Sequence, residues 1–331
     1  MNAIRRIGIV GAGAWGTTLG LVAGRAGSSA TVWAFEPDVA EAINTRHENP
    51  YLHGVELDPA LRATHRLGDL ADADALLLVT PAQHLRGICT ELSRMAPDGI
   101  PAVICAKGIE IATGKLLSDV VAETMPRSPV AVLSGPTFAA EVARGQPAAV
   151  TLACADDGLA GALIAALGAP AFRPYRSTDQ TGAQVGGAVK NVLAIASGIV
   201  TGRALGDSAR AALITRGMAE MLRLGEALGG ERETLMGLSG LGDLVLTCTS
   251  ATSRNMRLGI ALGEERPPAA TAHAAVAEGV ATAAAVSVLA ARLDVDMPIC
   301  AAVDAVVNHG AAIDGTIRAL MDRPFRAETD A

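Results

Sequence analysis

Lysine is scarce in this chain, and one lysine lies where a primary amine could act as an acid or a base. Only Lys107, Lys115 and Lys190 are lysines, and the other 24 of the 27 basic residues are arginines. Lys190 and Asn191 are expected at the start of a helix, within an apolar stretch that would partly desolvate the ammonium group and lower its pKa. A guanidinium stays protonated and could not replace it. The sequence predicts Lys190 as an acid–base residue, and a lysine that extends from a helix end to solvent is the alternative.

A second group of polar residues follows further along the chain. A glycine-rich segment ends at Asp243, and Thr247, Ser253, Arg254 and Asn255 come after it. A carboxylate at Asp243 could orient the active lysine, or it could cap a helix. The guanidinium of Arg254 offers a planar fork to phosphate oxygens, and Ser253 and Asn255 add neutral donors. Taken alone, Arg254 would be interpreted as a surface residue.

Three glycines near the N-terminus have the spacing G-x-G-x-x-G. Gly11 would turn the chain, Gly13 would admit a pyrophosphate to the backbone, and Gly16 would let a helix pack closely on a strand. An apolar run at 7–10 predicts the strand, and a second run at 17–23 predicts the helix, whose unpaired N–H groups would bind the phosphates. This context favours a dinucleotide site over a chance glycine-rich turn.

An acidic residue, Glu36, ends the next predicted strand. A carboxylate there can accept hydrogen bonds from the adenosine ribose and would repel a 2′-phosphate. We therefore expect NAD or NADP as the cofactor, with NAD favoured. The alternatives are that Glu36 is only a solvated strand-end charge, or that the nearby Arg46 compensates for it.

Short apolar runs alternate with helical stretches in the first half of the chain, which predicts βαβ units and a parallel sheet. Polar loops at 80–83, 107–108 and 134–138 follow three of these strands and should face one crevice. After about residue 174 only helical periodicity remains, with Ser208 as a candidate N-cap and a second helical region at 269–291. We predict an N-terminal α/β domain (1–180), doubly wound and Rossmann-like, and an all-α C-terminal domain (181–331). The predicted strands are 6–10, 30–35, 75–80, 102–106, 130–134 and 148–153.

Composition excludes several classes of protein. The net charge of −7 argues against a nucleic-acid partner or an anionic membrane surface. The five cysteines are widely spaced without a C-x-x-C pair, which argues against a disulfide framework or a metal site and favours a cytoplasmic protein. The uncharged stretch 7–24 imitates a membrane span or signal peptide, but its six glycines indicate a strand, a turn and a helix instead.

Taken together, these residues resemble the NAD(P)-dependent glycerol-3-phosphate dehydrogenases of the bacterial type, from Gly8 to about Asn308. The family interconverts dihydroxyacetone phosphate and sn-glycerol 3-phosphate. The motifs that carry the resemblance are G-A-G-A-W-G (11–16), A-K-G (106–108), S-G-P-T-F-A (134–139), G-A-V-K-N-V (187–192), A-L-I-T-R-G (212–217), G-L-G-D-L-V-L-T-C-T (240–249), S-R-N (253–255) and V-A-E-G (276–279).

The resemblance implies roles at the matching positions. Lys190 would be the proton acceptor, with Lys107, Asp243, Asn191 and Thr247 as further catalytic residues. The implied substrate contacts are Lys107, Gly135, Thr137, Lys190, Asp243, Ser253, Arg254 and Asn255. The implied cofactor contacts are Gly11, Gly13, Ala14, Trp15, Gly16, Phe35, Glu36, Lys107, Ala139, Arg254, Val276 and Glu278. No metal is expected.

Two departures and two alternatives accompany the resemblance. The Phe35-Glu36 pair is similar to the NAD-preferring animal enzymes, whereas many bacterial members have Arg or His at the first position. The loop 199–203 lacks the family's usual Asp-Gly, so its shape is expected to differ. There are two alternatives to this activity: a related two-domain hydroxyacid dehydrogenase and a non-catalytic redox sensor that binds a dinucleotide. The resemblance further implies a cytoplasmic homodimer, without a membrane span, that supplies glycerol phosphate for phospholipids.

Overall fold

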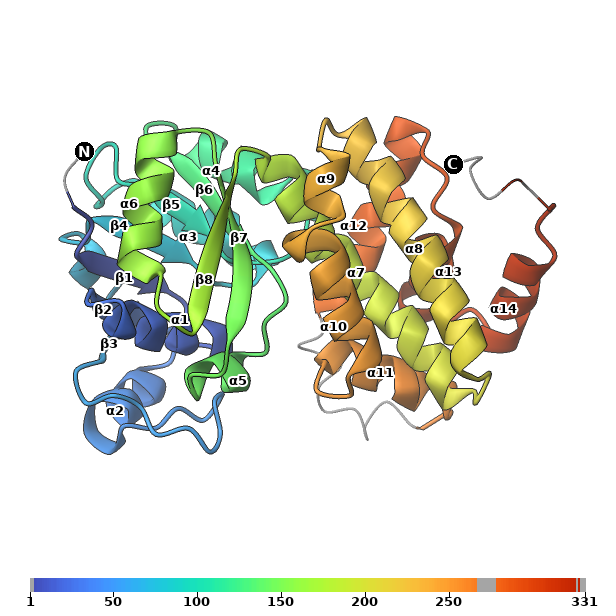
Figure 1. Cartoon of the computed structure of the whole chain (residues 1–331), viewed down its shortest axis with the longest axis horizontal. Coiled ribbons are helices and arrows are strands. Elements are labelled where there is room, and N and C mark those ends of the chain that lie inside the picture. The colour runs from blue at the N-terminus through green and yellow to red at the C-terminus, as the bar shows by residue number, and fades with distance from the viewer. Residues whose placement is uncertain (1–2, 267–277, 326, 328–331) are drawn as a thin grey trace. The chain divides into compact units, whose positions relative to one another are not determined.

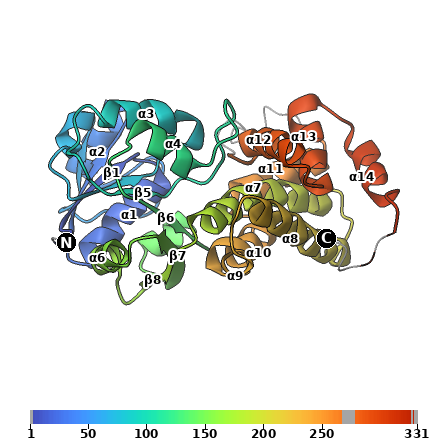
Figure 2. The ribbon, with the colours of Figure 1, turned by 90° about the horizontal axis from the view of Figure 1, so that it is seen from above.

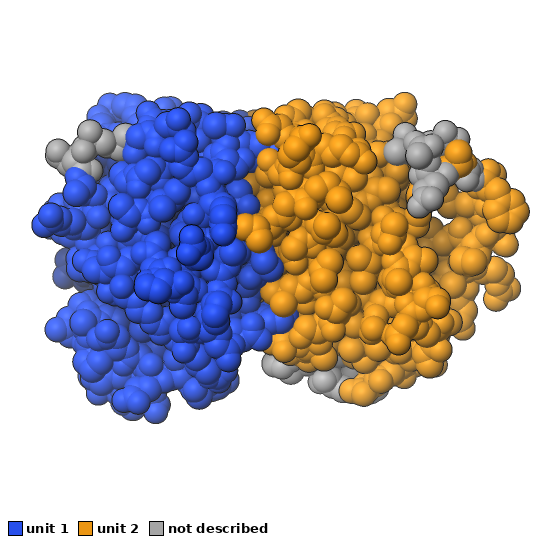
Figure 3. Space-filling model, in the orientation of Figure 1, with its two compact units in different colours: residues 1–106, 117–180 blue, residues 107–116, 181–331 orange. Residues whose placement is uncertain are grey.

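The computed structural model describes residues 3–266, 278–325 and 327. The chain forms two compact units (Figure 3): unit 1 comprises residues 1–106 and 117–180, and unit 2 comprises residues 107–116 and 181–331. The division into domains 1–180 and 181–331 stays a prediction. The segment 107–116 clusters with unit 2, although it lies inside the first of these ranges.

Unit 1 is built on one eight-stranded sheet with the order β3-β2-β1-β4-β5-β6-β7-β8 (Figure 1). All neighbours are parallel except β6 and β7, so the predicted parallel sheet contains one antiparallel pair. Parallel neighbours need a long crossover, whereas the link from β6 to β7 contains only a five-residue helix. The doubly wound, Rossmann-like fold is confirmed. The strands are β1 (Arg6–Val10), β2 (Ser29–Trp33), β3 (Arg62–Thr64), β4 (Ala75–Leu78), β5 (Ala102–Ile104), β6 (Val130–Ser134), β7 (Ala148–Cys154) and β8 (Phe172–Ser177).

Helices cover both faces of this sheet, with α1 and α6 on one face and α3 and α4 on the other (Figure 2). The side chains of β4 alternate between the two layers: Leu77 belongs to the core that contains α1 and α6, and Leu76 and Leu78 are buried on the opposite side. Burial on both faces explains the continuous apolar runs of the inner strands. The helices are α1 (Ala14–Arg25), α2 (Pro37–Arg46), η1 (Leu67–Leu70), η2 (Ala82–His84), α3 (Leu85–Leu92), α4 (Leu117–Thr124), α5 (Ala139–Ala143) and α6 (Asp157–Leu167).

The two strands that the sequence did not predict, β3 and β8, are the edges of the sheet. β3 has only three residues, and β8 has the sequence FRPYRS, in which both arginines and the tyrosine are exposed and only the phenylalanine is fully buried. Neither has the apolar run that marks an interior strand. The expectation that no strand extends past residue 174 was wrong, because β8 continues to Ser177.

Unit 2 is helical in its described residues, apart from a bridge between Ile109 and Leu116. Lys190 and Asn191, expected at a helix start, lie in the middle of α7. The glycines before them are helical; a Cβ on Gly186 would stand 2.5 Å from the carbonyl oxygen of Ser239, so these glycines allow close packing. Ser208 is not an N-cap, because α8 already begins at Asp207. The helices are α7 (Gln180–Gly202), α8 (Asp207–Ala227), α9 (Arg232–Leu235), η3 (Leu238–Gly242), α10 (Asp243–Thr249), α11 (Arg254–Gly263), α12 (Glu278–Leu293), α13 (Pro298–His309) and α14 (Ile313–Met321).

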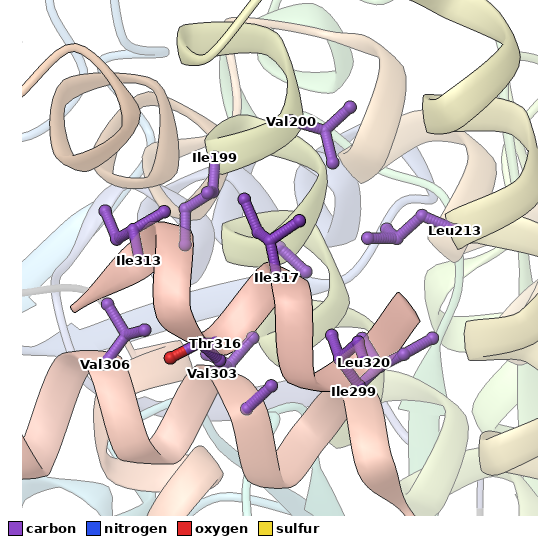
Figure 4. Close-up of a pocket in the computed structure, with 12 residues that line it drawn as sticks. Ile199, Val200, Leu213, Ile299, Val303, Val306, Ile313, Thr316, Ile317 and Leu320 are labelled. Carbon is purple, nitrogen blue, oxygen red and sulfur yellow. The ribbon is translucent and has the colours of Figure 1, made fainter. Parts of the chain in front are cut away.

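An apolar pocket lies in unit 2, bordered by α7, α8, α13 and α14 (Figure 4). Ile199, Leu213, Val303 and Ile317 line it from these four helices, and Thr316 is the one polar side chain among the residues that line it. No residue of α14 is buried, so this helix packs more loosely than the others around the pocket.

One described helix, α7, has the length and apolar composition of a membrane span. Nearly nine tenths of its apolar window is buried inside the protein, which is the burial of a core helix. The uncharged segment 7–24 forms β1, a turn and α1, as predicted from its glycines.

Candidate functional site

The glycine-rich turn joins β1 to α1 in unit 1. Gly11 has φ +124°, which favours glycine, and a Cβ on Gly16 would stand 1.8 Å from the carbonyl oxygen of Gly11. At Gly13 a Cβ would meet no atom within 4 Å, so the backbone at the start of α1 is open to a ligand. No acidic side chain lies in the first turn of α1. The turn therefore fits a dinucleotide pyrophosphate at a helix N-terminus.

Residues expected to contact the cofactor surround this turn. Ala14 and Trp15 begin α1, and the buried indole N–H of Trp15 has no partner in the described structure. Ala139 begins α5, where its carbonyl accepts a hydrogen bond from Thr18 of α1 at 3.1 Å. Val276 lies outside the described residues.

Phe35 and Glu36 follow β2. Phe35 is 79% exposed and packs edge-on against Trp33, with ring centroids 6.3 Å apart. Glu36 is exposed and immediately precedes α2. Arg46 is the last residue of that ten-residue helix, about 15 Å further along its axis. The guanidinium of Arg46 is therefore poorly placed to compensate for Glu36.

The loop after β6 contains two predicted substrate contacts. Gly135 has φ +158°, and a Cβ there would stand 2.8 Å from the Cα of Val150. Thr137 donates from Oγ1 to the carbonyl of Gly135 at 3.3 Å. The buried hydroxyls of Thr80 and Ser134, at the carboxyl ends of β4 and β6, have no partner in the described structure. They belong to the predicted polar loops 80–83 and 134–138, and they add donors beyond the individual residues that were predicted to contact a ligand.

In unit 2 one carboxylate joins two lysines. Asp243 is 1% exposed, and its two oxygens lie 2.5 Å from Lys107 Nζ and 3.2 Å from Lys190 Nζ. Lys190 Nζ also donates to Thr247 Oγ1 at 2.9 Å, and Thr247 Oγ1 donates to Asp243 Oδ1 at 3.3 Å. Burial lowers the pKa of Lys190, the carboxylate of Asp243 opposes this, and the charge of Lys107 adds to it. Such a group can exchange a proton with a ligand.

Three different elements position this cluster. Lys190 comes from the middle of α7. Asp243 and Thr247 face the same side of α10 because they are four residues apart. A π-helical turn, η3, leads into α10. Lys107 is supplied by the segment 107–116, which is bridged at Ile109 and Leu116.

The remaining polar residues form a second network. Asn255 donates to Asn191 Oδ1 at 2.9 Å and accepts from the backbone N–H of Gly279 at 3.1 Å, while Asn191 donates to the carbonyl of Gly187. Asn255 is buried, and among the described residues one of its two amide hydrogens has an acceptor, so the other can serve a ligand. Ser253 caps α11 by accepting from the N–H of Met256 at 3.2 Å.

Arg254 is exposed at the first turn of α11, and Glu278 begins α12. Burial raises the pKa of Glu278, and the charges of Arg254, Lys190 and Lys107 oppose this shift. Three basic groups therefore lie within electrostatic range of Glu278 in unit 2. Lys115 lies on the same bridged segment as Lys107, and its backbone N–H donates to Thr113 Oγ1.

Sequence reasoning missed Asn49 and Tyr51, which contact the glycine turn and Glu36. Asn49 is 3% exposed and donates to the carbonyl of Ala12 at 2.9 Å, and Tyr51 donates to Glu36 Oε1 at 3.0 Å. The N-P-Y segment looks like an ordinary turn, and only its long-range contacts distinguish it. Among the described residues, no group of three His, Cys, Asp or Glu side chains could hold a metal ion.

Comparison with known proteins identifies the family of this chain. A model of the N-terminus of NAD-dependent glycerol-3-phosphate dehydrogenase matches residues 6–160, and a model of its C-terminus matches residues 179–318. The glycerol-3-phosphate dehydrogenase [NAD(P)+] of Parvibaculum lavamentivorans is 55% identical over 99% of both chains. That of Rhodospirillum rubrum is also 55% identical, over 98% of this chain and 94% of the relative.

Solved structures give the same result. The glycerol-3-phosphate dehydrogenase of Coxiella burnetii superposes with a TM-score of 0.92 at 37% identity, over 97% of this chain and 99% of that chain. A D-mandelate dehydrogenase, with a TM-score of 0.61 at 15% identity over 94% of this chain and 99% of that chain, shares the fold alone. The chain therefore belongs to the NAD-dependent glycerol-3-phosphate dehydrogenase family.

Proposed function

We propose that this chain catalyses reversible hydride transfer between NAD(P)H and dihydroxyacetone phosphate, which gives sn-glycerol 3-phosphate. The observation that carries the proposal is the Asp243 carboxylate held between Lys107 and Lys190, in a chain that also has a dinucleotide turn. Family membership supports the same activity. A redox sensor would need the turn but would have no use for the buried lysine pair.

In this proposal the nicotinamide supplies the hydride to the substrate carbonyl when the cofactor is bound. Lys190 Nζ gives a proton to the developing alkoxide and recovers one in the reverse direction. Thr247 and Asp243 hold the amine of Lys190 in place, and Lys107 stabilises negative charge on the oxygen. The guanidinium of Arg254 and the remaining amide hydrogen of Asn255 anchor the phosphate, which limits the motion of the reacting carbon.

Oxidation of NADH and NADPH in the presence of dihydroxyacetone phosphate tests the proposal. Turnover with this substrate, and not with hydroxyacid-dehydrogenase ketones, is the expected result. The variant Lys190→Met should lose several orders of magnitude in kcat while it still binds NADH, because Met fills the space of Lys but carries no proton. Near-normal turnover by this variant would remove Lys190 from its role.

We also propose a cytoplasmic homodimer that supplies the glycerol phosphate backbone of phospholipids. The five cysteines are buried and form no disulfide, which supports a reducing compartment. The largely exposed Met321 and Phe325 support burial of apolar surface in an assembly. Light scattering after size exclusion, at several protein concentrations, would give the oligomeric state.

A further inference from the structure

The segment that follows α2 forms an unbroken set of hydrogen bonds between the glycine turn and Glu36. Asn49 Nδ2 donates to the carbonyl of Ala12 at 2.9 Å and to Thr17 Oγ1 at 2.7 Å. The Oδ1 atom of Asn49 accepts from the backbone N–H of Tyr51 at 2.7 Å. Tyr51 Oη then donates to Glu36 Oε1 at 3.0 Å.

The two ends of this set differ in burial. Asn49 is 3% exposed and its amide binds the turn itself, so the backbone of the segment is fixed relative to the expected pyrophosphate position. Tyr51 is half exposed and Glu36 is exposed at the end of β2. An exposed glutamate samples several rotamers, and a donor held by a rigid segment reduces that freedom. The phenol thus sets the position of a carboxylate that would otherwise be free to rotate.

The hydrogen bond from Tyr51 still leaves the Glu36 carboxylate able to bind a ligand. Tyr51 engages Oε1, and among the described residues no side chain donates to Oε2. Glu36 raises the pKa of the Tyr51 hydroxyl, which keeps this hydroxyl a donor at neutral pH. The hydrogen bond from Tyr51 therefore leaves one oxygen of the Glu36 carboxylate for a ligand.

We infer that Tyr51 is a positioning residue for cofactor selectivity: it holds the Glu36 carboxylate where it accepts from the ribose 2′-hydroxyl of NADH and repels the 2′-phosphate of NADPH. The inference rests on the proposed use of NAD(P). A 2′-phosphate carries a charge of about −1.5 to −2 at neutral pH, so a fixed carboxylate opposes it more strongly than one that can rotate away. Removal of the phenol hydroxyl should weaken NADH binding and relax discrimination against NADPH.

The test is the variant Tyr51→Phe, which keeps the ring and removes the hydroxyl. The Kd values of NADH and NADPH are measured by nicotinamide fluorescence, without the second substrate. We expect the ratio of the NADPH Kd to the NADH Kd to fall roughly threefold to tenfold, the change that one net hydrogen bond gives. The chain's only other tyrosine, Tyr175, is exposed to the same extent on β8, so Tyr175→Phe is the matched control and should leave the ratio unchanged.

A double-mutant cycle with Glu36→Gln tests whether Tyr51 changes cofactor selectivity through the Glu36 carboxylate. Tyr51→Phe should have no further effect on the ratio when Glu36 has already lost its charge. Three results would overturn the inference. The ratio of the NADPH Kd to the NADH Kd could stay unchanged in Tyr51→Phe, because neither cofactor is affected or because both bind more weakly by the same factor. Alternatively, Tyr51→Phe could change this ratio just as much in the Glu36→Gln background. A wild-type ratio near 1 would also overturn the inference. Because these are binding measurements, they hold even if the protein fails to reduce dihydroxyacetone phosphate, which would overturn only the proposed function.

Discussion

One carboxylate, Asp243, lies between two ammonium groups, and this arrangement governs the protonation of Lys190. Burial lowers the pKa of Lys190, and the negative charge of Asp243 limits the decrease. The cluster as a whole keeps an excess of positive charge, which favours an anionic substrate. The hydrogen bond from Lys190 to Thr247 and the one from Thr247 to Asp243 fix the direction of the amine.

Loss of the Asp243 charge should shift the pH dependence of the reaction. In Asp243→Asn the attraction that raises the pKa of Lys190 is gone, so this pKa falls further. In the reductive direction the protonated amine is the acid, and kcat should therefore decline at lower pH in the variant than in the wild type. Measurement of kcat from pH 6 to 10 in both proteins checks this. If kcat declined at the same alkaline pH in both proteins, Asp243 would not influence the protonation of Lys190.

The sequence indicated the individual residues of this cluster but not their contacts. Lys107 and Asp243 are 136 positions apart, and their ion pair depends on segment 107–116 packing in unit 2. Lys190 was misplaced to a helix start because the glycines before it look like a turn, whereas they pack against the segment 239–240. The sequence around Tyr51 contains no motif that indicates its role, since its partner Glu36 precedes α2 and Tyr51 follows it.

At the scale of elements, α7 and α11 approach each other so closely that only glycine fits. A Cβ on Gly198 would stand 2.2 Å from the carbonyl oxygen of Met256, and one on Gly259 would stand 2.1 Å from that of Ile195. The contact sets the distance between the helix that carries Lys190 and the helix that begins with Arg254. Backbone atoms cannot move away as a flexible side chain can.

The variant Gly198→Ala should lower the free energy of unfolding by about 1–3 kcal/mol, because the added methyl group overpacks this contact. Gly24→Ala in α1 is the matched control: its Cβ would meet nothing within 4 Å, and it should stabilise the helix by about 0.5–1 kcal/mol. Urea denaturation of both variants measures the difference. Equal stabilities would show that α7 and α11 can separate without cost.

A buried carboxylate also links two helices of unit 2. Glu220 of α8 is 1% exposed and accepts from the N–H groups of Ile299 and Cys300, at 2.7 and 3.0 Å, in the first turn of α13. Burial raises the pKa of Glu220 to about 7, against these two N–H donors and the charge of Arg223. The group therefore titrates near neutral pH in the folded protein.

This pKa predicts how stability depends on pH. An acid whose pKa is 4.5 when unfolded and about 7 when folded binds its proton more tightly in the folded state. Its favourable effect is fully present below about pH 4.5 and is lost as the pH rises through 7, by an amount on the order of 3 kcal/mol. In Glu220→Gln the free energy of unfolding should fall less between pH 5 and 8 than in the wild type. Urea denaturation at these pH values measures the change. An equal change in the free energy of unfolding in both proteins would contradict the raised pKa of Glu220.

At the scale of the whole molecule, the chain passes between the two units three times, near residues 106, 116 and 180. The excursion 107–116 brings Ile109 and Leu116 into the core of unit 2, where they are 0% and 7% exposed. Composition and periodicity predicted an α/β region and a helical region, but an excursion of ten residues has no periodicity of its own. The helical unit is therefore incomplete without a segment from the first half of the chain.

A fragment of residues 181–331 should accordingly unfold at a lower urea concentration than the same fragment with residues 107–116 joined by a flexible linker. Each of the two apolar side chains contributes roughly 1.5–3 kcal/mol when buried. Circular dichroism in a urea series measures both midpoints, and Ile109→Ser within the joined segment should return the midpoint toward that of the bare fragment. Identical midpoints with and without the segment would show that unit 2 does not depend on it.

The burial of the five cysteines should protect them from reagents that label thiols. All five are buried, and burial raises the pKa values of the Cys89 and Cys248 thiols to about 12. Reagents that alkylate thiols attack the thiolate, so the native chain should stay unlabelled at neutral pH. A single cysteine introduced at an exposed position of each unit would then accept a fluorescent dye without removal of any native residue. Energy transfer between two such dyes would measure whether the distance between the two labelled positions changes when cofactor and substrate bind.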